Sequence, residues 1–390
     1  MNTDTIRAML LKTFHAAVAS ADPAATLAQH LPEPPKGRLV IVGAGESAAA
    51  MARAAEKAYA GQSFSGVVVT SYGYTVPTER IEVLEAGHPV PDQNSMVAAR
   101  RILAAVQGLG REDLVVALIS GGGSALFALP EDGVTLAEKV DVNRRLLASG
   151  LPIAQMNALR RRLSAVKGGK LARAAWPARV VTLAISDVPG DSPMDIASGP
   201  TVPDSRSERD LTLLVDALGP DIPHHIHRML LTPASSAPGG ELDFRLIASP
   251  IIALEAAAQV AHSHGVMPVI LGDALEGEAA GLGQMMAGIA QGVKRHGHPA
   301  RRPALLLSGG ETTVTLGGTP AGKGGRNTEF VLALALALTG SSGIHAVACD
   351  TDGIDGSEDA AGAFIAPDTL DRARRLGIDP QDYLRRHDSY

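Results

Sequence analysis

Two glycine-rich stretches in the first half of the chain have the composition of phosphate-binding loops. Gly-Ala-Gly at residues 43–45 follows an apolar run, and Ser-Gly-Gly-Gly-Ser at residues 120–124 follows another. Ser-Gly-Gly-Glu at residues 308–311 repeats the arrangement in the second half. Backbone N–H groups that no side chain shields point readily at an anion, although a plain tight turn needs the same residues. The phosphate-binding residues predicted from these loops are Gly43, Gly45, Ser120, Gly121, Gly122, Gly123, Ser124, Gly309 and Gly310.

Aspartates follow two of the predicted strands. Asp187 and Asp191 lie in Ser-Asp-Val-Pro-Gly-Asp, and three further aspartates occupy residues 350–355. Mg²⁺ binds through a few carboxylates together with waters and substrate phosphates, so two such side chains are enough for a site. The alternative is turn chemistry, because aspartate often hydrogen-bonds the backbone two residues further on. We predict that Asp187 and Asp191 bind a metal ion or the substrate.

Several cations and one histidine complete the set of candidate site residues. Arg326 comes after Gly-Gly and directly before a helical pattern, where a guanidinium can bind an oxyanion beside backbone donors. Asn157 and Arg160 are three residues apart on one predicted helix face, and Lys167 lies at the end of that helix. His88 follows a predicted strand. Asn157, Arg160, Lys167 and His88 are candidate substrate ligands. The alternative for the cations is that they are exposed to solvent or stabilise the end of the helix.

The elements that would position these residues alternate between short apolar runs and helical patterns. This alternation predicts an α/β protein with a largely parallel sheet, in which ligands bind beyond the carboxyl ends of the strands. The predicted strands are 39–42, 67–70, 81–85, 114–120, 180–186, 245–248, 267–271, 304–308, 313–316 and 344–349. The predicted helices include 3–19, 141–149, 153–166, 252–264, 278–296 and 330–338.

The chain length predicts two domains. A chain of 390 residues is longer than a domain with a single hydrophobic core usually is. The segment 231–243 is rich in Pro, Gly and Ser, as a linker between domains would be. We expect a Rossmann-like domain over residues 1–235 and a smaller α/β domain over residues 236–390, with the active site in the cleft between them. Residues 317–325 are expected to form a mobile glycine loop.

Composition narrows the class of protein. A net charge of −6 is unlike that of a general nucleic-acid binder, and a single cysteine excludes an intramolecular disulfide. The longest apolar run, residues 330–338, is shorter than a membrane helix, and no secretory leader is recognised at the N-terminus. We therefore expect a cytoplasmic enzyme that acts on a small molecule, with no nucleic-acid or membrane partner; a homodimer is left open.

Three common enzyme patterns are absent or incomplete in the sequence. The Walker A pattern is absent, and Leu126 occupies the last position of a Gly-x-Ser-x-Gly elbow. Gly43, Gly45 and Ala48 fit a dinucleotide fingerprint, which argues for an NAD(P)H-dependent reductase. That site requires an acid about 20 residues further on, and none occurs near the second strand before Glu79.

Taken together and in order, the motifs resemble those of the class II glycerate kinases, which are glycerate 2-kinases with a DUF4147 and a MOFRL domain. The matches include Ala-Gly-His-Pro-x-Pro-Asp, Lys-Gly-Gly-x-Leu-Ala, Ile-Ala-Ser-Gly-Pro-Thr and Gly-x-Gly-Gly-Arg-Asn, and they run from about residue 39 to residue 363. The resemblance implies phosphorylation of D-glycerate to 2-phosphoglycerate with ATP and Mg²⁺. It implies that Arg326 stabilises the transferring phosphoryl group and that Asp187 acts at the metal or at the substrate hydroxyl. Some members carry the older label hydroxypyruvate reductase and lie in tartrate operons.

The sequence departs from this family at two places. Glu46 stands where members usually have a catalytic lysine, and a negative charge beside a triphosphate is unfavourable. Lys167 or Lys323 would then have to supply the missing cation. The family also continues through a Gly-Pro-Thr-x-Thr-Asn-Val-Asn-Asp tail, whereas this sequence ends at Tyr390. Impaired catalysis, an NAD(P)H-dependent hydroxypyruvate reductase, and a non-catalytic protein that binds glycerate or nucleotide are the alternatives.

Overall fold

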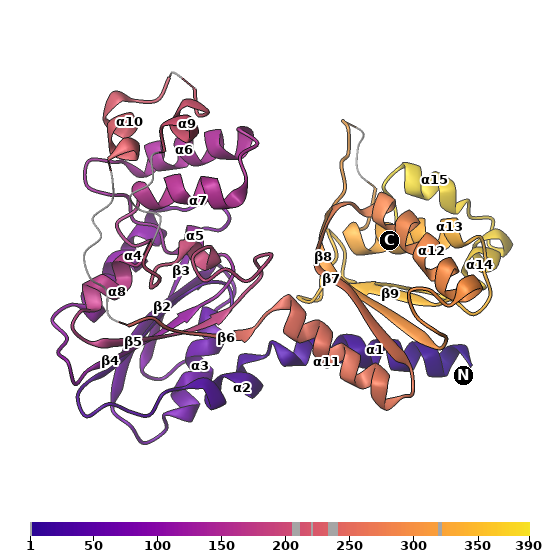
Figure 1. The fold of residues 1–390 in the computed structure, drawn as a ribbon, viewed down its shortest axis with the longest axis horizontal. Helices are drawn as coiled ribbons and strands as arrows, with labels where there is room; N and C mark the ends of the chain where they lie inside the picture. The colour runs from indigo at the N-terminus through magenta and orange to yellow at the C-terminus, as the bar shows by residue number, and fades with distance from the viewer. Residues whose placement is uncertain (1, 205–210, 220, 233–240, 319–321) are drawn as a thin grey trace. The chain divides into compact units, whose positions relative to one another are not determined.

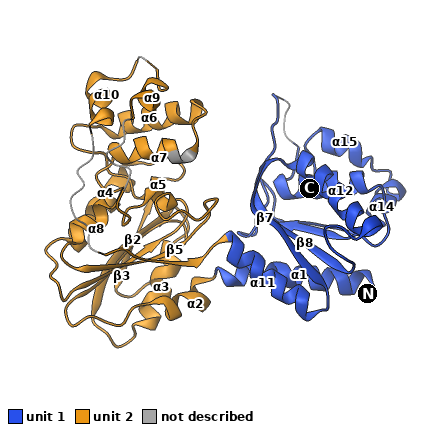
Figure 2. Ribbon diagram, viewed as in Figure 1, with its two compact units in different colours: residues 1–21, 250–390 blue, residues 22–249 orange. Residues whose placement is uncertain are grey.

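A computed structural model of the protein describes residues 2–204, 211–219, 221–232, 241–318 and 322–390. The chain forms two compact units (Figure 2). Unit 2 comprises Asp22–Ser249, and unit 1 comprises Met1–Ala21 together with Pro250–Tyr390. The division predicted from sequence, between residues 235 and 236, falls in the segment 233–240, which lies outside the described residues.

Unit 2 is built on a six-stranded sheet with the order β3-β2-β1-β4-β5-β6, in which all neighbouring strands are parallel (Figure 1). This arrangement confirms the predicted α/β class. The strands are β1 Leu39–Ala44, β2 Phe64–Ser71, β3 Ile81–Ala86, β4 Leu114–Ile119, β5 Arg179–Ile185 and β6 Asp243–Ala248. The helices are α2 Pro23–Thr26, η1 Leu27–His30, α3 Ala48–Ala58, α4 Gln93–Val106, α5 Gly123–Leu126, α6 Leu136–Ala148, α7 Ile153–Arg162, α8 Lys170–Ala175, η2 Ile196–Ser198, α9 Thr212–Asp216 and α10 His224–Leu231.

The central strands of this sheet are apolar on both faces because both faces are covered. All six residues of β1 and all six of β4 are buried. Along β1, Val40 and Val42 belong to a core that includes residues of α4 and α8, whereas Ile41 belongs to a second core with residues of α3. Alternate side chains of one strand therefore serve two layers of helices, and continuous apolar runs are the sequence signature of such a sheet.

A separate group of helices, α6, α7, α9 and α10, packs around its own apolar cluster. Helix α7 ends at Arg162, four residues before the predicted end at residue 166. Beyond it the chain leaves the helix, because Ser164 forms a β-bridge with Pro130 and Ala165 N donates to Leu129 O.

Unit 1 contains two pairs of strands and six helices among the described residues. Strands β7 (Met267–Glu278) and β8 (Ala304–Thr313) are parallel, and β9 (Ala346–Cys349) is antiparallel to β10 (Gly362–Ile365). The helices pack on these strands and on one another. They are α1 Thr3–Ser20, α11 Pro250–Ser263, α12 Ala279–His296, α13 Arg326–Leu338, α14 Thr369–Arg375 and α15 Pro380–Arg385. Helix α1 packs along α11, and Met9 and Leu10 share an apolar cluster with Ala261 and Val266.

One predicted pair of strands in unit 1 is wrong. The strand expected at residues 304–308 continues through Gly309 and Gly310 to Thr313 as one strand, β8, and residues 314–316 of the second expected strand are not in a strand. Gly310 has a φ of +137°, and a Cβ there would collide with the backbone of Leu275 on β7. The glycine pair marks an irregularity in strand pairing, where two backbones approach closely, rather than the end of a strand.

Within the described ranges, no helix combines the length and the apolar character needed to cross a membrane.

Candidate functional site

The glycine loops of unit 2 meet at the point where the strand order of the sheet reverses. Strands β1 and β4 are neighbours, and the loops that follow them contain residues 45–47 and 120–124. Glu46 N donates to Gly121 O at 2.9 Å, and Ser47 N donates to Ser120 Oγ at 3.0 Å. Open α/β sheets bind ligands in the crevice at such a switch point. We call these two segments the switch-point loops.

The switch-point loops leave no room for side chains at their glycines. Gly45 has a φ of +139° and faces Ser120, and Gly122 has a φ of +73°. A Cβ on Gly123 would lie 2.8 Å from the Cβ of Ala197 and 3.0 Å from Ala44 O. Gly43 lies inside β1 rather than in the loop, and a Cβ there would be 2.6 Å from Leu118 O; its predicted role in binding phosphate remains a prediction. Its role in the fold is close packing of two strands.

Glu46 and His88 lie together over the second glycine loop. His88 Nδ1 is 3.3 Å from Glu46 Oε1, and both side chains lie within about 3 Å of where a Cβ on Gly122 would be. His88 therefore lies beside this loop, and its role as a substrate ligand remains a prediction. The side chain at position 46 brings a carboxylate to the loop and is paired with an imidazole.

The two predicted metal ligands are in the loop that follows β5. A Cβ on Gly121 would collide with the carboxylate of Asp187, so this carboxylate covers the first glycine of the loop. Asp191 Oδ1 is buried and has no hydrogen-bond partner, and Asp191 has a φ of +51°. A buried carboxylate oxygen without a donor fits a cation ligand. The described residues contain no group of three or more His, Cys, Asp or Glu side chains arranged around a metal site.

Lys167 reaches the second switch-point loop from beyond α7. Its Nζ is 2.5 Å from Ser124 Oγ and 2.6 Å from Ser124 O, and the residue is 3% exposed. Burial, followed by repulsion from Lys139, Arg160 and Arg161, holds the pKa of the Lys167 amine well below its usual value. Ser124 Oγ also lies 3.1 Å from Ser198 Oγ.

Asn157 and Arg160 form a polar cluster with their neighbours on α7. Arg160 Nη1 donates to Asn157 Oδ1 at 3.2 Å, and Asn157 Nδ2 donates to Asp195 Oδ1 at 3.0 Å. Arg161 Nε donates to Asp204 Oδ2 at 2.7 Å. Burial lowers the pKa of Arg160.

Sequence reasoning did not select Ser198 as a site residue. Ser198 and the preceding Ala197 have φ values of +62° and +50°, a left-handed conformation that costs non-glycine residues energy. This strained turn carries the hydroxyl that lies against Ser124. No pattern of residue types reveals a left-handed alanine and serine, so only the motif Ile-Ala-Ser-Gly-Pro-Thr marked the segment.

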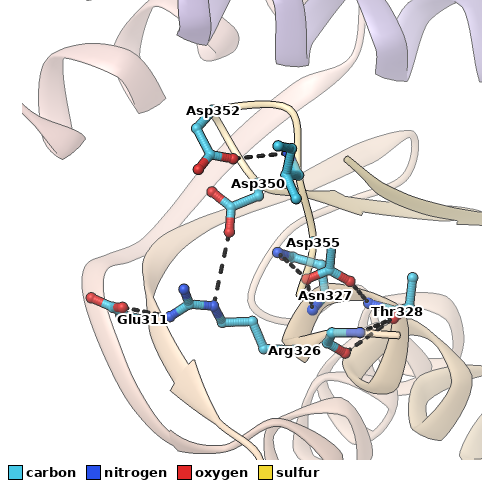
Figure 3. A network of polar contacts seen from close by, with 9 residues as sticks. Glu311, Arg326, Asn327, Thr328, Asp350, Asp352 and Asp355 are labelled. Atoms are coloured by element: carbon cyan, nitrogen blue, oxygen red, sulfur yellow. Dashed lines mark hydrogen bonds and ion pairs between the residues drawn. The ribbon is translucent and has the colours of Figure 1, made fainter. Parts of the chain in front are cut away.

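In unit 1, Arg326 is the first residue of α13 and is held by two carboxylates (Figure 3). Its Nη1 is 2.5 Å from Glu311 Oε1, and its Nε is 3.8 Å from Asp350 Oδ2. The hydrogen bond with Glu311, opposed by burial, raises the pKa of Arg326, while burial and the nearby Asp352 raise that of Asp350.

The N-terminus of α13 already binds a carboxylate of the protein itself. Asp355 is 1% exposed and accepts from Asn327 N at 2.9 Å and from Thr328 N at 2.8 Å (Figure 3). These are the backbone donors that the sequence suggested for an oxyanion beside Arg326. Lys323, the other proposed replacement cation, lies 3.4 Å from Glu358. Gly309 and Gly310 lie within β8, and their predicted role in binding phosphate remains a prediction.

Comparison with known proteins gives two family matches. Residues 9–231 match the domain of unknown function DUF4147, and residues 304–390 match the MOFRL family.

Individual relatives span nearly the whole chain. A D-glycerate 2-kinase of Thermotoga maritima is 36% identical over 99% of this chain and 92% of its own length. A protein of Agrobacterium vitis with the provisional name hydroxypyruvate reductase is 56% identical over 100% of this chain and 89% of its own length. The crystal structure of glycerate kinase from Thermotoga maritima superimposes with a TM-score of 0.88, covering 99% of this chain and 93% of that chain.

Both family matches occur in chain order, the first covers more than half of the chain, and full-length relatives exceed 30% identity. The chain therefore belongs to the DUF4147–MOFRL family, which includes the glycerate 2-kinases.

Proposed function

We propose that this protein is a glycerate 2-kinase that transfers the γ-phosphoryl group of ATP to D-glycerate and forms 2-phosphoglycerate. The similarity to a D-glycerate 2-kinase over 99% of the chain supports this activity. The structural observation that carries the proposal is the meeting of two glycine loops at the β1–β4 switch point, with the carboxylate of Asp187 over Gly121. Phosphoryl transfer requires mainly positioning and charge neutralisation, which this set of residues suits.

Residues of unit 2 are proposed to bind the phosphates, the substrate and Mg²⁺. Backbone N–H groups of the switch-point loops bind phosphate oxygens, and Asn157 and Arg160 orient the carboxylate of the substrate. Asp187 and Asp191 would hold Mg²⁺, because Asp191 Oδ1 is buried without a hydrogen-bond donor. A bound Mg²⁺ would neutralise phosphate charge. Asp187 is also proposed to contact the hydroxyl of the substrate.

Arg326 of unit 1 is proposed to stabilise the transferring phosphoryl group. Its guanidinium is bound by Glu311 and lies near Asp350, so two carboxylates orient it in the described structure. Because Asp355 occupies the backbone donors at the start of α13, Arg326 would act through its side chain alone. A small-molecule substrate and a nucleotide are the partners implied; a homodimer and a cytoplasmic location remain predictions.

A reductase remains the second candidate because a relative that is 56% identical carries that name. A dinucleotide site would place an acid after β2 for the ribose hydroxyls. Here Tyr72 and Gly73 follow β2, and Thr70 at its end donates to Glu46 O at 3.0 Å. The loop chemistry therefore favours phosphate over a dinucleotide.

The test is a coupled assay of the full chain with ATP, Mg²⁺ and D-glycerate, and 2-phosphoglycerate is identified by NMR. A parallel reaction contains hydroxypyruvate with NADH or NADPH. Formation of 2-phosphoglycerate without oxidation of the nicotinamide is expected. Nicotinamide oxidation without phosphorylation would favour the reductase, and calorimetric binding of glycerate or nucleotide without either reaction would indicate a binding protein.

A further inference from the structure

Lys167, Ser124 and Ser198 form a continuous chain of hydrogen-bonding groups. Lys167 Nζ is 2.5 Å from Ser124 Oγ, which is 3.1 Å from Ser198 Oγ. The amine donates to Ser124 O at 2.6 Å, and in its charged form it also donates to Ser124 Oγ; a neutral amine can instead accept from the serine hydroxyl through its lone pair. A hydroxyl between two such partners can give one proton while it receives another.

The surroundings of Lys167 favour the neutral amine. Among the described residues, the charges that repel a proton on Lys167 are those of Lys139 on α6 and of Arg160 and Arg161 on α7. Asp195 and Asp204, the acids of this region, are engaged by Asn157 and Arg161. A lysine that is 3% exposed among cations loses its proton far more readily than one in water.

Burial of the Lys167 amine costs free energy, which its hydrogen bonds with Ser124 offset in part. The strained turn at Ala197 and Ser198 is a second cost at the same place, since both have positive φ. Strain of this kind is common at functional sites. Two unfavourable features that meet on Ser124 indicate a function for this hydroxyl.

We propose that Lys167 is the terminal proton acceptor of the phosphoryl transfer and that the proton reaches it through Ser124. This inference rests on the proposed function. The substrate hydroxyl oxygen forms a bond to the γ-phosphorus, and the bond from this phosphorus to the bridging oxygen breaks, so that ADP leaves with the electron pair. The substrate proton moves to Ser124 Oγ while the Ser124 proton moves to Lys167 Nζ. The resulting ammonium returns its proton to water before the next turnover.

The experiment compares kcat against pH for the full chain, Lys167→Ala and Lys139→Met. We expect Lys167→Ala to lower kcat by about 10²–10³-fold with the KM values of ATP and D-glycerate changed less. Added primary amines should restore part of the rate, and the acidic limb of the profile should follow the pKa of each amine.

Lys139 is the matched control, because it is also buried and donates to Leu163 O, but in the described part of the chain it contacts no serine hydroxyl. Lys139→Met should keep the plateau of kcat and move the acidic limb to higher pH, since one repelling cation is gone.

Two results would overturn the assignment. One is a Lys167→Ala enzyme that keeps kcat and loses only affinity for glycerate, which would make Lys167 a binding residue. The other is a loss that no amine rescues, with the acidic limb unchanged in Lys139→Met, which would leave the proton to another group such as Asp187. If Lys167→Ala does not fold, Ser124→Ala takes its place and should lose kcat to a similar degree. If the unmodified chain phosphorylates D-glycerate, either of these results contradicts only the role of Lys167. If the unmodified chain shows no phosphorylation, the proposed kinase activity itself is contradicted.

Discussion

At the scale of single residues, the carboxylate of Glu46 is the feature most at odds with a kinase. It stands over Gly122, paired with His88 at 3.3 Å, where a phosphate is proposed to bind. A negative charge there opposes ATP, and a lysine would attract it. We expect kcat/KM for ATP to rise from Glu46 through Glu46→Gln to Glu46→Lys. The gain should be about tenfold in total, because the side chain is 45% exposed and water screens part of the effect.

The order of these three proteins distinguishes charge from shape, since glutamine matches glutamate in size. Steady-state assays at low and high ionic strength check the electrostatic origin, because salt should narrow the differences. A decrease in activity with both substitutions would instead show that the Glu46–His88 pair assists the reaction.

The buried amine of Lys139 makes a second residue-scale prediction. Burial, followed by repulsion from Lys170 and Arg160, lowers its pKa to about 7. The unfolded chain therefore binds more protons than the folded chain between about pH 7 and pH 10.5, and the free energy of unfolding should rise with pH across this window. Lys139→Met should remove this rise and stabilise the protein by a few kcal/mol, on the order of 3, at pH 7 and below. The carbonyl of Leu163 keeps Glu131 N as a donor, so no acceptor is left unpaired.

Urea unfolding at several pH values measures this effect. Lys12→Met on the exposed part of α1 serves as the control, since removing an exposed lysine should leave the pH dependence unchanged. Equal pH dependence in Lys139→Met and the unmodified chain would contradict the prediction.

At the scale of elements, Asp355 fixes the start of α13 and with it Arg326. Its two carboxylate oxygens accept from Asn327 N and Thr328 N. Asp355→Ala should lower the free energy of unfolding of unit 1 by about 1–2 kcal/mol, the usual value for a lost N-cap, and should lower kcat if Arg326 acts as proposed. Asp352→Ala is the matched control, because Asp352 accepts only from the exposed Ile354 N in the described contacts. Thermal unfolding and the kinase assay together measure both effects; unchanged stability of Asp355→Ala would exclude the capping role.

The elements also show what the sequence could reveal. The central strands β1 and β4 were predictable because buried strands are continuous apolar runs. Gly45 and Gly122 were recognisable as loop residues because their turns need positive φ. Gly309 and Gly310 resembled a loop in the sequence yet lie within β8, because close approach to β7 also requires glycine. The contacts of Lys167 with Ser124 and of Arg326 with Glu311 join separate segments of each unit, and residue spacing alone contains no information about them.

At the scale of the whole molecule, the first helix belongs to the unit formed by the last 141 residues, Pro250–Tyr390. Met9 and Leu10 on α1 are 5% and 4% exposed and share a cluster with Ala261 and Val266, so a piece comprising residues 250–390 alone would expose this apolar surface.

We expect residues 22–249, one continuous compact unit, to fold when expressed alone. Residues 250–390 alone should be unstable or aggregate, because unpaired apolar faces associate. Addition of a peptide of residues 1–21 should restore a cooperative thermal transition, followed by circular dichroism. A Met9→Asp, Leu10→Asp peptide is the control that should fail, and stable folding of residues 250–390 without any peptide would show that α1 is dispensable to this unit.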